Sequence, residues 1–373
     1  MNTIRGSFIE RVNRFVVKAR VGQETTRAHL PNPGRLWELL IPETPIYLIP
    51  KNNKSPEGKR LNYRVFACKK DENLVLLDTH YSNHLFKKLL LEKKLPFLEE
   101  VKDIKSEVKF LDSRIDFFLR KNHGKELLLE VKTCTLFGKK LSMFPDAPSK
   151  RATKHLLHLA KAVSKGLEPW VIFLVMNYDV NYFLPAYHID LEFSETLFKL
   201  RKLLKVKAIA LEIKENFEVE KVKELKIPFE ILEKEMKDRG AYFLVVQLDE
   251  PVKLRNWNLS SGYYVYVGSG MKGLHTRINR HLRRRKKLKW HIDYLLVHAK
   301  KVVPIPVVAS ERLECEMAKA VSEICDLAVK DFGCSDCNCD SHLFFFERNP
   351  ISNKKFQDIL TYFRMDRLCS YLS

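Results

Sequence analysis

Residues 113–136 read SRIDFFLRKNHGKELLLEVKTCTL, and the interpretation of the middle of the chain starts from this stretch. Two apolar runs, residues 115–119 and 127–131, flank a polar Lys-Asn-His-Gly-Lys-Glu turn. Runs of this length around a polar turn predict a β-hairpin with a loop of several residues. Because side chains alternate along a strand, residues two apart on it point to the same face.

Three charged residues stand on the predicted hairpin. Asp116 lies inside the first strand, and Glu130 and Lys132 lie at the end of the second. Two carboxylates can hold a hard cation such as Mg²⁺ or Mn²⁺, and a lysine can orient a water or neutralise phosphate charge. This is the Asp…Glu-x-Lys pattern of the PD-(D/E)XK nucleases. The alternative is a charged strand end that faces water.

Composition narrows the class of partner. The chain has 373 residues, 45% of them hydrophobic, and a formal net charge of +20. This length allows two or three domains, and the excess of Lys and Arg predicts a polyanionic partner, either nucleic acid or an anionic membrane surface. No apolar run approaches the roughly 18 residues of a transmembrane helix, and no amphipathic helix with an aromatic face supports membrane binding. Residues 1–20 show no signal peptide, so we expect a cytoplasmic protein with mostly reduced cysteines.

The first part of the chain, residues 1–77, has the pattern of a small β-barrel. Strand-like alternation, turn residues and a short helical stretch follow one another in the order of an OB-fold, which commonly binds oligonucleotides. The predicted elements are strands within residues 5–30, a turn at 31–34, one or two helical turns at 35–40, and strands at 45–49 and 61–68 around a polar loop at 51–59.

Basic residues of this barrel are candidates for nucleic-acid contact. Arg11, Arg14, Arg27 and Arg35, with Phe15 among them, suit a surface that binds phosphates and bases. For any one of them, the alternative is an arginine that merely solvates a strand edge.

Residues 78–229 alternate between helical and strand patterns, which predicts an α/β domain. We expect helices at 83–94, from 149 to about 165 and at 189–204, and strands at 107–110, in the hairpin and at 170–176. The second helix carries Arg151, Lys154, His155 and His158 at i, i+3, i+4 and i+7, so one of its faces should be basic.

Seven collinear blocks give this part of the chain a family resemblance. They span roughly residues 1–229 and read GSFIERVNRFVV, AHLPNPGRLWELL, LLDTHYSNHL, SRIDFFL, LEVKTCTL, FPDAPSKRATKHLLHL and FLPAYHIDLEF. In this order they resemble the sugar fermentation stimulation protein (SfsA) family, which implies a DNA-binding protein with an OB-like N-terminal part and a PD-(D/E)XK nuclease-like core. On that resemblance Asp116, Glu130 and Lys132 take the catalytic positions. Arg151, Lys154 and His155 follow on the next helix as nucleic-acid-binding residues.

A further α/β domain is expected from residue 240, after a strand and a helical linker rich in Lys and Glu at 214–239. We predict strands at 241–248 and 263–268 and a helix from 273. Seven of the ten residues at 280–289 are basic, which favours phosphate contact over a merely solvated face. The arginines of this run are Arg280, Arg283, Arg284 and Arg285.

The blocks GAYFLVV, GYYVYVGSG, LHTRINRHL, WHIDYLL, LECEMA and SDCNCDSHLFFF resemble a small domain related to the GIY-YIG nucleases, over about residues 240–347. By that likeness Tyr242 and Tyr266 are the paired tyrosines, Arg277 binds phosphate and Glu314 binds a metal. A tyrosine can pass a proton, an arginine forks onto phosphate and a carboxylate holds a cation. Three features depart from the family: 23 residues separate GAY from YVG, the terminal asparagine has no clear counterpart, and Glu316 competes with Glu314.

Near the end of this domain, Cys334, Cys337, Cys339 and His342 form a Cys-x2-Cys-x-Cys-x2-His pattern. Cysteine and histidine are the ligands that Zn²⁺ prefers, so Cys337, Cys339 and His342 are candidate zinc ligands. The spacing is cramped for a zinc knuckle, and partly buried reduced thiols are the alternative.

The sequence thus predicts an α/β multidomain protein with Mg²⁺-dependent cleavage of a nucleic-acid phosphodiester, DNA being the favoured substrate. The alternative is a non-catalytic DNA-binding regulator or architectural protein that retains nuclease folds. The oligomeric state stays open. The expected units are an OB-like barrel at 1–77, a nuclease-like core at 78–229, a linker at 230–239, a GIY-YIG-like domain at 240–347 and a tail at 348–373.

Overall fold

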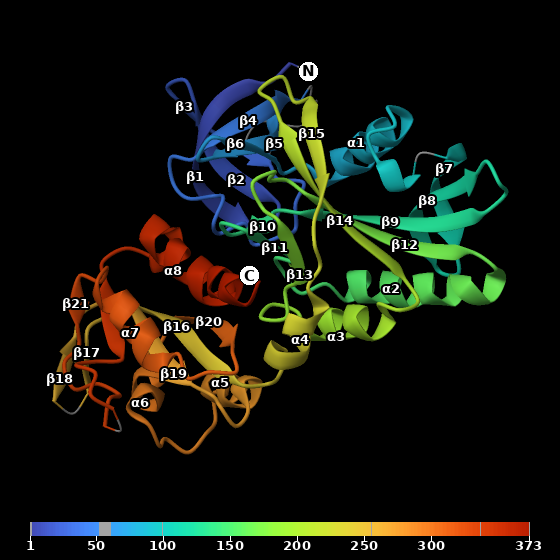
Figure 1. The fold of residues 1–373 in the computed structure, drawn as a ribbon. Helices are drawn as coiled ribbons and strands as arrows, with labels where there is room; N and C mark the ends of the chain where they lie inside the picture. Colours follow the sequence, from blue (N-terminus) through green and yellow to red (C-terminus); the bar gives the residue numbers. More distant parts are fainter. Residues whose placement is uncertain (1, 52–60, 99, 255, 336, 373) are drawn as a thin grey trace. The chain divides into compact units, whose positions relative to one another are not determined.

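The structure, a computed structural model, describes residues 2–51, 61–98, 100–254, 256–335 and 337–372. The chain divides into two compact units, Met1–Phe229 with Leu372–Ser373, and Glu230–Tyr371. Both units mix helices and strands (Figure 1). The polar loop predicted at 51–59 lies, apart from Lys51, outside the described residues.

The first unit begins with a six-stranded barrel of order β3-β2-β1-β4-β5-β6, which an additional β3–β5 pairing closes. Its apolar residues alternate inward, as Val17 and Ala19 do on β2. This is the expected OB-like barrel. Its strands are β1 (Ile4–Asn13), β2 (Val16–Val21), β3 (Glu24–His29), β4 (Pro45–Pro50), β5 (Tyr63–Lys70) and β6 (Asn73–Leu76).

The prediction of one or two helical turns at residues 35–40 is confirmed as a single turn, in which the carbonyl of Leu36 accepts hydrogen bonds from the N–H groups of Leu39 and Leu40. The turn does not extend toward the N-terminus, because Leu36 has a φ of +54°, which a right-handed helix does not allow. The apolar spacing that suggested a helix buries Leu36 and Leu39 against the barrel core.

The rest of the first unit is a six-stranded mixed sheet of order β15-β14-β12-β9-β8-β7, with three helices. Neighbours β9, β12 and β14 are parallel, whereas β7–β8, β8–β9 and β14–β15 are antiparallel. The predicted hairpin is therefore present as β8 and β9. The strands are β7 (Val101–Phe110), β8 (Ser113–Lys121), β9 (Glu126–Cys134), β12 (Glu168–Val175), β14 (Lys205–Ile213) and β15 (Val219–Glu224); a small second sheet holds β10 (Leu136–Phe137), β11 (Leu141–Phe144) and β13 (Tyr182–Pro185). The helices are α1 (Thr79–Leu91), α2 (Lys150–Ala162) and α3 (Leu191–Leu200), with 3-10 turns η1 (Pro96–Leu98) and η2 (Val163–Lys165).

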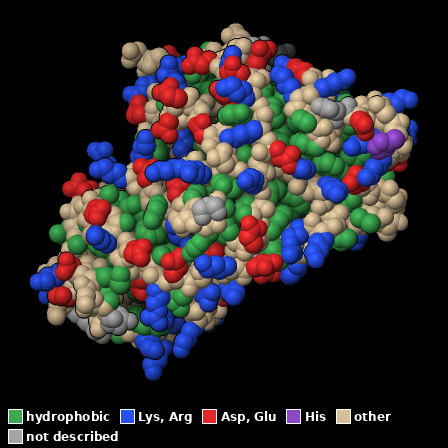
Figure 2. Space-filling model, viewed as in Figure 1, with side chains coloured by type: hydrophobic (Ala, Val, Ile, Leu, Met, Phe, Trp, Pro, Cys, Tyr) green, Lys and Arg blue, Asp and Glu red, His purple; other side chains and the backbone are tan. Residues whose placement is uncertain are grey.

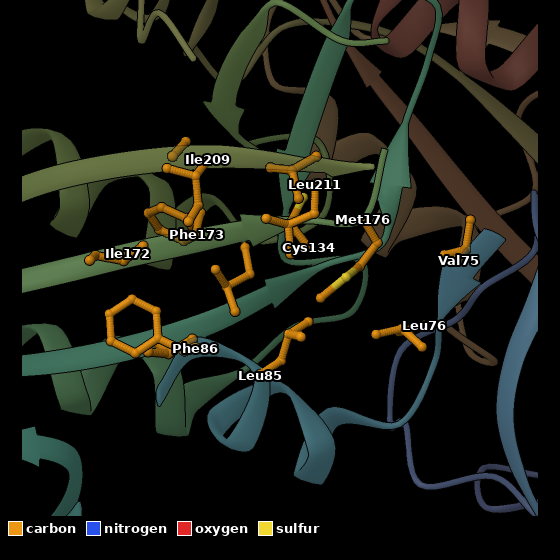
Figure 3. Packing of buried hydrophobic residues seen from close by; sticks show 14 of the residues in the cluster. Val75, Leu76, Leu85, Phe86, Cys134, Ile172, Phe173, Met176, Ile209 and Leu211 are labelled. Atoms are coloured by element: carbon orange, nitrogen blue, oxygen red, sulfur yellow. The ribbon is translucent and has the colours of Figure 1, made fainter. Parts of the chain in front are cut away.

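Barrel and mixed sheet share one continuous apolar core. In Figure 3, Phe86 of α1 lies near Ile172 of β12, Leu85 lies between Phe86 and Leu76, and Val75 and Leu76 of β6 border the same cluster. Each such fully buried side chain stabilises the fold by roughly 1.5–3 kcal/mol. The barrel is thus packed onto the mixed sheet of the first unit and is not a separately tethered module.

The second unit is built on an antiparallel sheet of order β20-β16-β19-β22-β21. A small β17–β18 hairpin occupies part of the long segment between β16 and β19, which accounts for the 23 residues between GAY and YVG. The strands are β16 (Gly240–Leu248), β17 (Val252–Leu254), β18 (Trp257–Leu259), β19 (Gly262–Ser269), β20 (Lys301–Val308), β21 (Leu327–Ala328) and β22 (Leu343–Phe346). The helices are α4 (Phe229–Glu235), α5 (Leu274–Leu282), α6 (His291–Val297), α7 (Glu314–Ser322) and α8 (Lys354–Arg364), with η3 (Pro350–Ser352) and η4 (Asp366–Tyr371).

The helices near the two ends of this unit, α4 and α8, both bury apolar side chains. Ile231 and Leu232 of α4 are buried, and Phe356 of α8 packs edge-on against Phe243 of β16 with ring centroids 5.7 Å apart. Helix α8 therefore closes the second unit. No helix in the described part of the chain is both long enough and apolar enough to cross a membrane.

Candidate functional site

The first candidate site lies where β8 and β9 separate. Their antiparallel ladder runs from Arg120↔Glu126 to Phe117↔Leu129 and ends there. Asp116 and Glu130 are the next residues on the two strands, so both carboxylates lie at the point of divergence. Beyond this point a side chain takes over the hydrogen bonding between the two strands: Asp116 Oδ2 accepts a hydrogen bond of 2.8 Å from the backbone N–H of Val131.

Two helices contribute partners that the hairpin pattern did not identify, and one of them is His155, which was predicted to bind nucleic acid. Asn83 of α1 donates its side-chain amide to Asp116 Oδ1 at 2.7 Å. Lys132 Nζ lies 2.5 Å from Glu130 Oε1, and His155 of α2 contacts the same oxygen through Nδ1. Glu130 is thus held by two cationic or hydrogen-bonding groups, and Asp116 by two hydrogen-bond donors.

The two carboxylates differ in their electrostatics. Burial raises the pKa of Asp116 to about 6, and the charge of neighbouring Glu130 adds to the shift. Burial also acts to raise the pKa of Glu130, but Lys132 and then His155 outweigh it, so this pKa lies below its usual value. Glu130 is therefore ionised at neutral pH, and its charge repels that of Asp116.

This donor set fits a hard divalent cation. Two adjacent carboxylates supply the oxygen ligands that Mg²⁺ and Mn²⁺ prefer, and a cation between them would relieve the repulsion that raises the pKa of Asp116. The three residues predicted from the hairpin, Asp116, Glu130 and Lys132, are brought together.

The basic face predicted on α2 divides in two. Ser149 caps this helix by accepting a hydrogen bond from the N–H of Ala152. Arg151 and Lys154 are exposed, and Lys154 pairs with Asp112 at 2.6 Å.

The two histidines of this face turn toward the sheet. His155 is 4% exposed and contacts Glu130, and His158 is buried with its Nδ1 2.8 Å from Ser113 Oγ. His155 therefore positions a carboxylate and does not present itself to a phosphate.

The barrel arginines have different environments. The guanidinium of Arg11 donates at 2.6 Å to the carbonyls of Gly34, Arg35 and Arg14, so it holds the 31–35 turn in place. Arg35 is partly buried and lies over the Trp37 ring at 4.9 Å. Arg14 is exposed beside exposed Phe15, and Arg27 is exposed too. Arg14, Arg27 and Phe15 thus offer a surface to a ligand, whereas Arg11 serves the fold.

The second candidate site surrounds the hydroxyl of Tyr242 on β16. Its ring lies 6.3 Å from that of Tyr266 on β19, centroid to centroid. Burial raises the pKa of Tyr242 well above its usual value; the charge of Glu314 acts in the same direction and that of Arg277 opposes it. The other three residues predicted from the GIY-YIG likeness, Tyr266, Arg277 and Glu314, therefore all influence the pKa of the Tyr242 hydroxyl.

His281 and Asp293 join this site, and the sequence pattern did not single them out. Tyr242 Oη lies 2.8 Å from His281 Nε2, and His281 Nδ1 lies 3.3 Å from Asp293 Oδ1. Burial lowers the pKa of His281 to about 4, so the ring is neutral at pH 7. With its Nδ1 proton facing Asp293, Nε2 accepts a hydrogen bond from the tyrosine hydroxyl and orients it.

The basic residues at 280–289 have two kinds of surroundings: some form internal contacts and others are exposed. Arg280 donates to both carboxylate oxygens of Asp293, at 3.1 and 2.9 Å, and so belongs to the support of His281. Arg283, Arg284 and Arg285 are exposed. Figure 2 shows Lys and Arg side chains at the lower tip of this face, where the chain passes between α5 and α6. These three arginines are free to meet a polyanion.

A third cluster contains soft ligands. The ligand atoms of Cys315, Cys337, Cys339 and His342 all lie within 4.8 Å of one another. Cys334 lies outside the cluster formed by the described residues, with its sulfur 3.8 Å from the carbonyl of Asp340. In the cluster, Cys315 of α7 takes the place that the sequence pattern gave to Cys334. The spacing of the pattern could not reveal Cys315, because it lies 19 residues before Cys334.

Glu314 and Glu316, which competed for one role, lie in different surroundings. Glu314 Oε1 is 3.4 Å from His342 Nδ1. Glu316 instead lines a shallow pocket of about 450 Å³ with Tyr362 and Arg367. Of the two, Glu314 is the carboxylate near Tyr242.

Comparison with known families divides the chain in three. Residues 9–77 match the SfsA N-terminal OB domain, residues 80–217 the sugar fermentation stimulation protein RE domain, and residues 241–365 a domain of unknown function, DUF123.

Whole relatives match the first unit. A sugar fermentation stimulation protein homolog of Methanosphaera stadtmanae is 40% identical over 197 residues, which cover 52% of this chain and 81% of that protein. A homolog of the same description from Clostridium botulinum is 36% identical over 208 residues, covering 56% and 87%. The structure of Pyrococcus furiosus SfsA in complex with Ca²⁺ aligns with a TM-score of 0.55 and 28% identity, over 61% of this chain and 96% of that one.

Proposed function

The chain belongs to the sugar fermentation stimulation protein family, and from that premise we propose that it binds DNA and hydrolyses its phosphodiester bonds with Mg²⁺ or Mn²⁺ held by Asp116 and Glu130. The observation that carries the proposal is the meeting of these two carboxylates with Lys132 where β8 and β9 separate. These three residues have the types and the strand positions that the Asp…Glu-x-Lys pattern of a PD-(D/E)XK nuclease requires.

Each residue of this site has a chemical part. When bound, the cation lowers the pKa of a coordinated water and stabilises the leaving oxyanion. Asp116 and Glu130 would supply its oxygen ligands, and His155 and Asn83 orient those carboxylates. Lys132, which lies on the same face, stabilises the negative charge of the attacking water or of the scissile phosphate.

The relative with bound Ca²⁺ supports a divalent cation in this family. Ca²⁺ takes carboxylate oxygens as Mg²⁺ does, although it accepts more ligands at longer distances. Arg151 on α2, and Arg14 and Arg27 of the barrel, are exposed and provide positive charge for the DNA backbone.

In the second unit we propose a GIY-YIG-like site formed by Tyr242, Tyr266, Arg277 and Glu314. The neutral His281 accepts a hydrogen bond from Tyr242 Oη over 2.8 Å, which fixes the position of this hydroxyl in the proposed site. The exposed arginines 283–285 add a phosphate-binding segment near it.

A specific observation favours a second candidate, a DNA-binding regulator without catalysis. Glu130 already has two internal partners, Lys132 and His155, and such an ion pair could stand where an ancestor bound metal. The two candidates differ in their need for metal: the nuclease requires the cation for cleavage, whereas the regulator needs no cation for its function.

The deciding experiment uses the full-length chain with labelled single-stranded, duplex and branched DNA and RNA, each with Mg²⁺, Mn²⁺ or a chelator. We expect cleavage in metal and none in chelator. Glu130→Gln should abolish it while DNA affinity stays nearly the same, because the carboxylate acts on the metal and not on the DNA. Glu126→Gln is the matched control, since Glu126 lies on the same strand but pairs with Arg120 near the hairpin loop.

Tyr242→Phe distinguishes the two units. Cleavage that survives Glu130→Gln and disappears in Tyr242→Phe would assign the activity to the second unit. Tight DNA binding with no cleavage of any substrate in any metal would replace the enzyme with the regulator.

A further inference from the structure

Four soft ligands from separate segments of the second unit converge on one point. Cys315 lies in the first turn of α7, Cys337 and Cys339 lie in the segment before β22, and His342 immediately precedes that strand. We propose that these residues bind one Zn²⁺ as a structural Cys3His site, which fastens α7 to the segment between β21 and β22.

The distances suit a tetrahedral ion. Zn–S bonds of about 2.3 Å and a Zn–N bond of about 2.0 Å set neighbouring ligand atoms about 3.5 to 3.8 Å apart. Cys337 Sγ lies 3.3 Å from His342 Nε2, and every pair among the four ligand atoms lies within 4.8 Å. Shifts of less than about 1 Å therefore complete the coordination, which is within the reach of a side-chain rotation.

The imidazole of His342 is oriented as a metal ligand. This ring is buried, and its Nδ1 lies 3.2 Å from the backbone carbonyl of Val267 and 3.4 Å from Glu314 Oε1. Both partners accept hydrogen bonds, so Nδ1 carries the proton and the lone pair of Nε2 points toward the sulfurs. A carbonyl or carboxylate on the far nitrogen is the usual support of a zinc-bound histidine.

The chemistry of the set selects the metal. Three thiolates and one imidazole are soft and borderline ligands, which favour Zn²⁺ over the hard cations Mg²⁺ and Ca²⁺. Four protein ligands leave no open position, so this site is structural and supplies no metal-bound water.

The site also stabilises the surroundings of Tyr242. Glu314 precedes the ligand Cys315 on α7 and contacts the ligand His342. Gly333 lies beside the ring of Tyr266, since a Cβ at this position would be 3.2 Å from Tyr266 Cε2. The zinc site thereby fixes the segments that carry Glu314 and flank Tyr266, whether or not the second unit cleaves nucleic acid.

Metal analysis of the full-length chain, purified under reducing conditions without chelator, tests the proposal. Wild type should contain one zinc per chain. Cys315→Ser should hold zinc at least about tenfold more weakly against a competing chelator, as loss of a ligand demands. Cys334→Ser is the matched control: it removes a nearby thiol outside the cluster and should keep its zinc.

Cobalt reconstitution tests the same site in the unaltered chain, so a variant that fails to fold cannot obscure the result. Co²⁺-loaded wild type should show thiolate-to-metal charge transfer and the strong visible absorption of tetrahedral cobalt. No zinc in wild type, even after incubation of the reduced protein with Zn²⁺, would overturn the proposal. So would zinc lost from Cys334→Ser but kept in Cys315→Ser, or the weak visible spectrum of octahedral cobalt.

Discussion

Replacement of Asp116 by Asn should make the first unit more stable at neutral pH. The side chain is buried, its pKa is raised from 3.8 to about 6, and burial and the charge of Glu130 are the main causes. The ionised form is therefore disfavoured in the folded protein relative to the unfolded chain. A shift of about two units corresponds to about 3 kcal/mol, since each unit is 1.36 kcal/mol.

The pH dependence has a definite sign. A carboxyl with a raised folded pKa binds its proton more tightly in the folded state, so wild type loses stability as pH rises from about 4 through 6. Asp116→Asn removes this loss. We expect it to stabilise the protein by about 1–3 kcal/mol at pH 7.5, below the full value because Asn has one oxygen for the two donors, Val131 N–H and the Asn83 amide, that Asp116 accepts from. At pH 4.5 the gain should be about 2 kcal/mol smaller than at pH 7.5, because most of the folded wild type is then protonated at Asp116.

Added metal should reduce the stability advantage of Asp116→Asn over wild type. A cation that binds only the folded wild type at ten times its dissociation constant stabilises it by about 1.4 kcal/mol, and Asp116→Asn should lose this effect. Scanning calorimetry of the full-length chain, between pH 4.5 and 8 with chelator or Mg²⁺, measures both. Asp112→Asn is the control: Asp112 is exposed, and its hydrogen bond from Lys154 lowers its pKa, so no stabilisation is expected. An Asp116→Asn protein that is less stable at pH 7.5, or whose difference from wild type is the same at all pH values, would refute this reasoning.

Three further predictions follow from the site and its surroundings. Changing Arg283, Arg284 and Arg285 to Glu should weaken DNA binding about equally for all sequences and reduce the salt dependence by up to about 0.9 log units per lost phosphate contact, and unchanged affinity in a salt titration would contradict it. Arg11→Lys should destabilise the protein by about 2–4 kcal/mol in guanidinium unfolding, because one ammonium cannot reach the four carbonyls that the guanidinium joins; a loss under 1 kcal/mol would refute that role. Lys132→Ala should lose cleavage and also bind DNA more weakly, whereas full activity would exclude this lysine from the site.

Local pattern was sufficient to predict the hairpin and its three charged residues. Alternation with a period of two sets which side chains share a face, and Glu130 and Lys132 follow that rule directly. The partners Asn83 and His155 come from helices far along the chain, so the strand pattern holds no information about them. The same long-range dependence hid Cys315, which joins the thiol cluster only through the packing of α7.

Helical spacing predicted correctly which residues of α2 share one face, but it did not predict which of them are buried. Arg151, Lys154, His155 and His158 are neighbours on one side of the helix, yet the position of the sheet buries the two histidines and leaves the other two exposed. Likewise, the turn containing Leu36 depends on a positive φ, which apolar spacing does not encode. Packing against other elements, and not local propensity, decided these positions.

The most direct test of the central claim is anomalous diffraction from crystals of the full-length chain soaked in Mn²⁺. We predict a peak between Asp116 and Glu130, about 2.0–2.4 Å from an oxygen of each, with Lys132 Nζ displaced from Glu130 Oε1. A map without such a peak at saturating Mn²⁺, in which Lys132 and His155 keep their contacts with Glu130, would contradict a metal-dependent nuclease site on this hairpin.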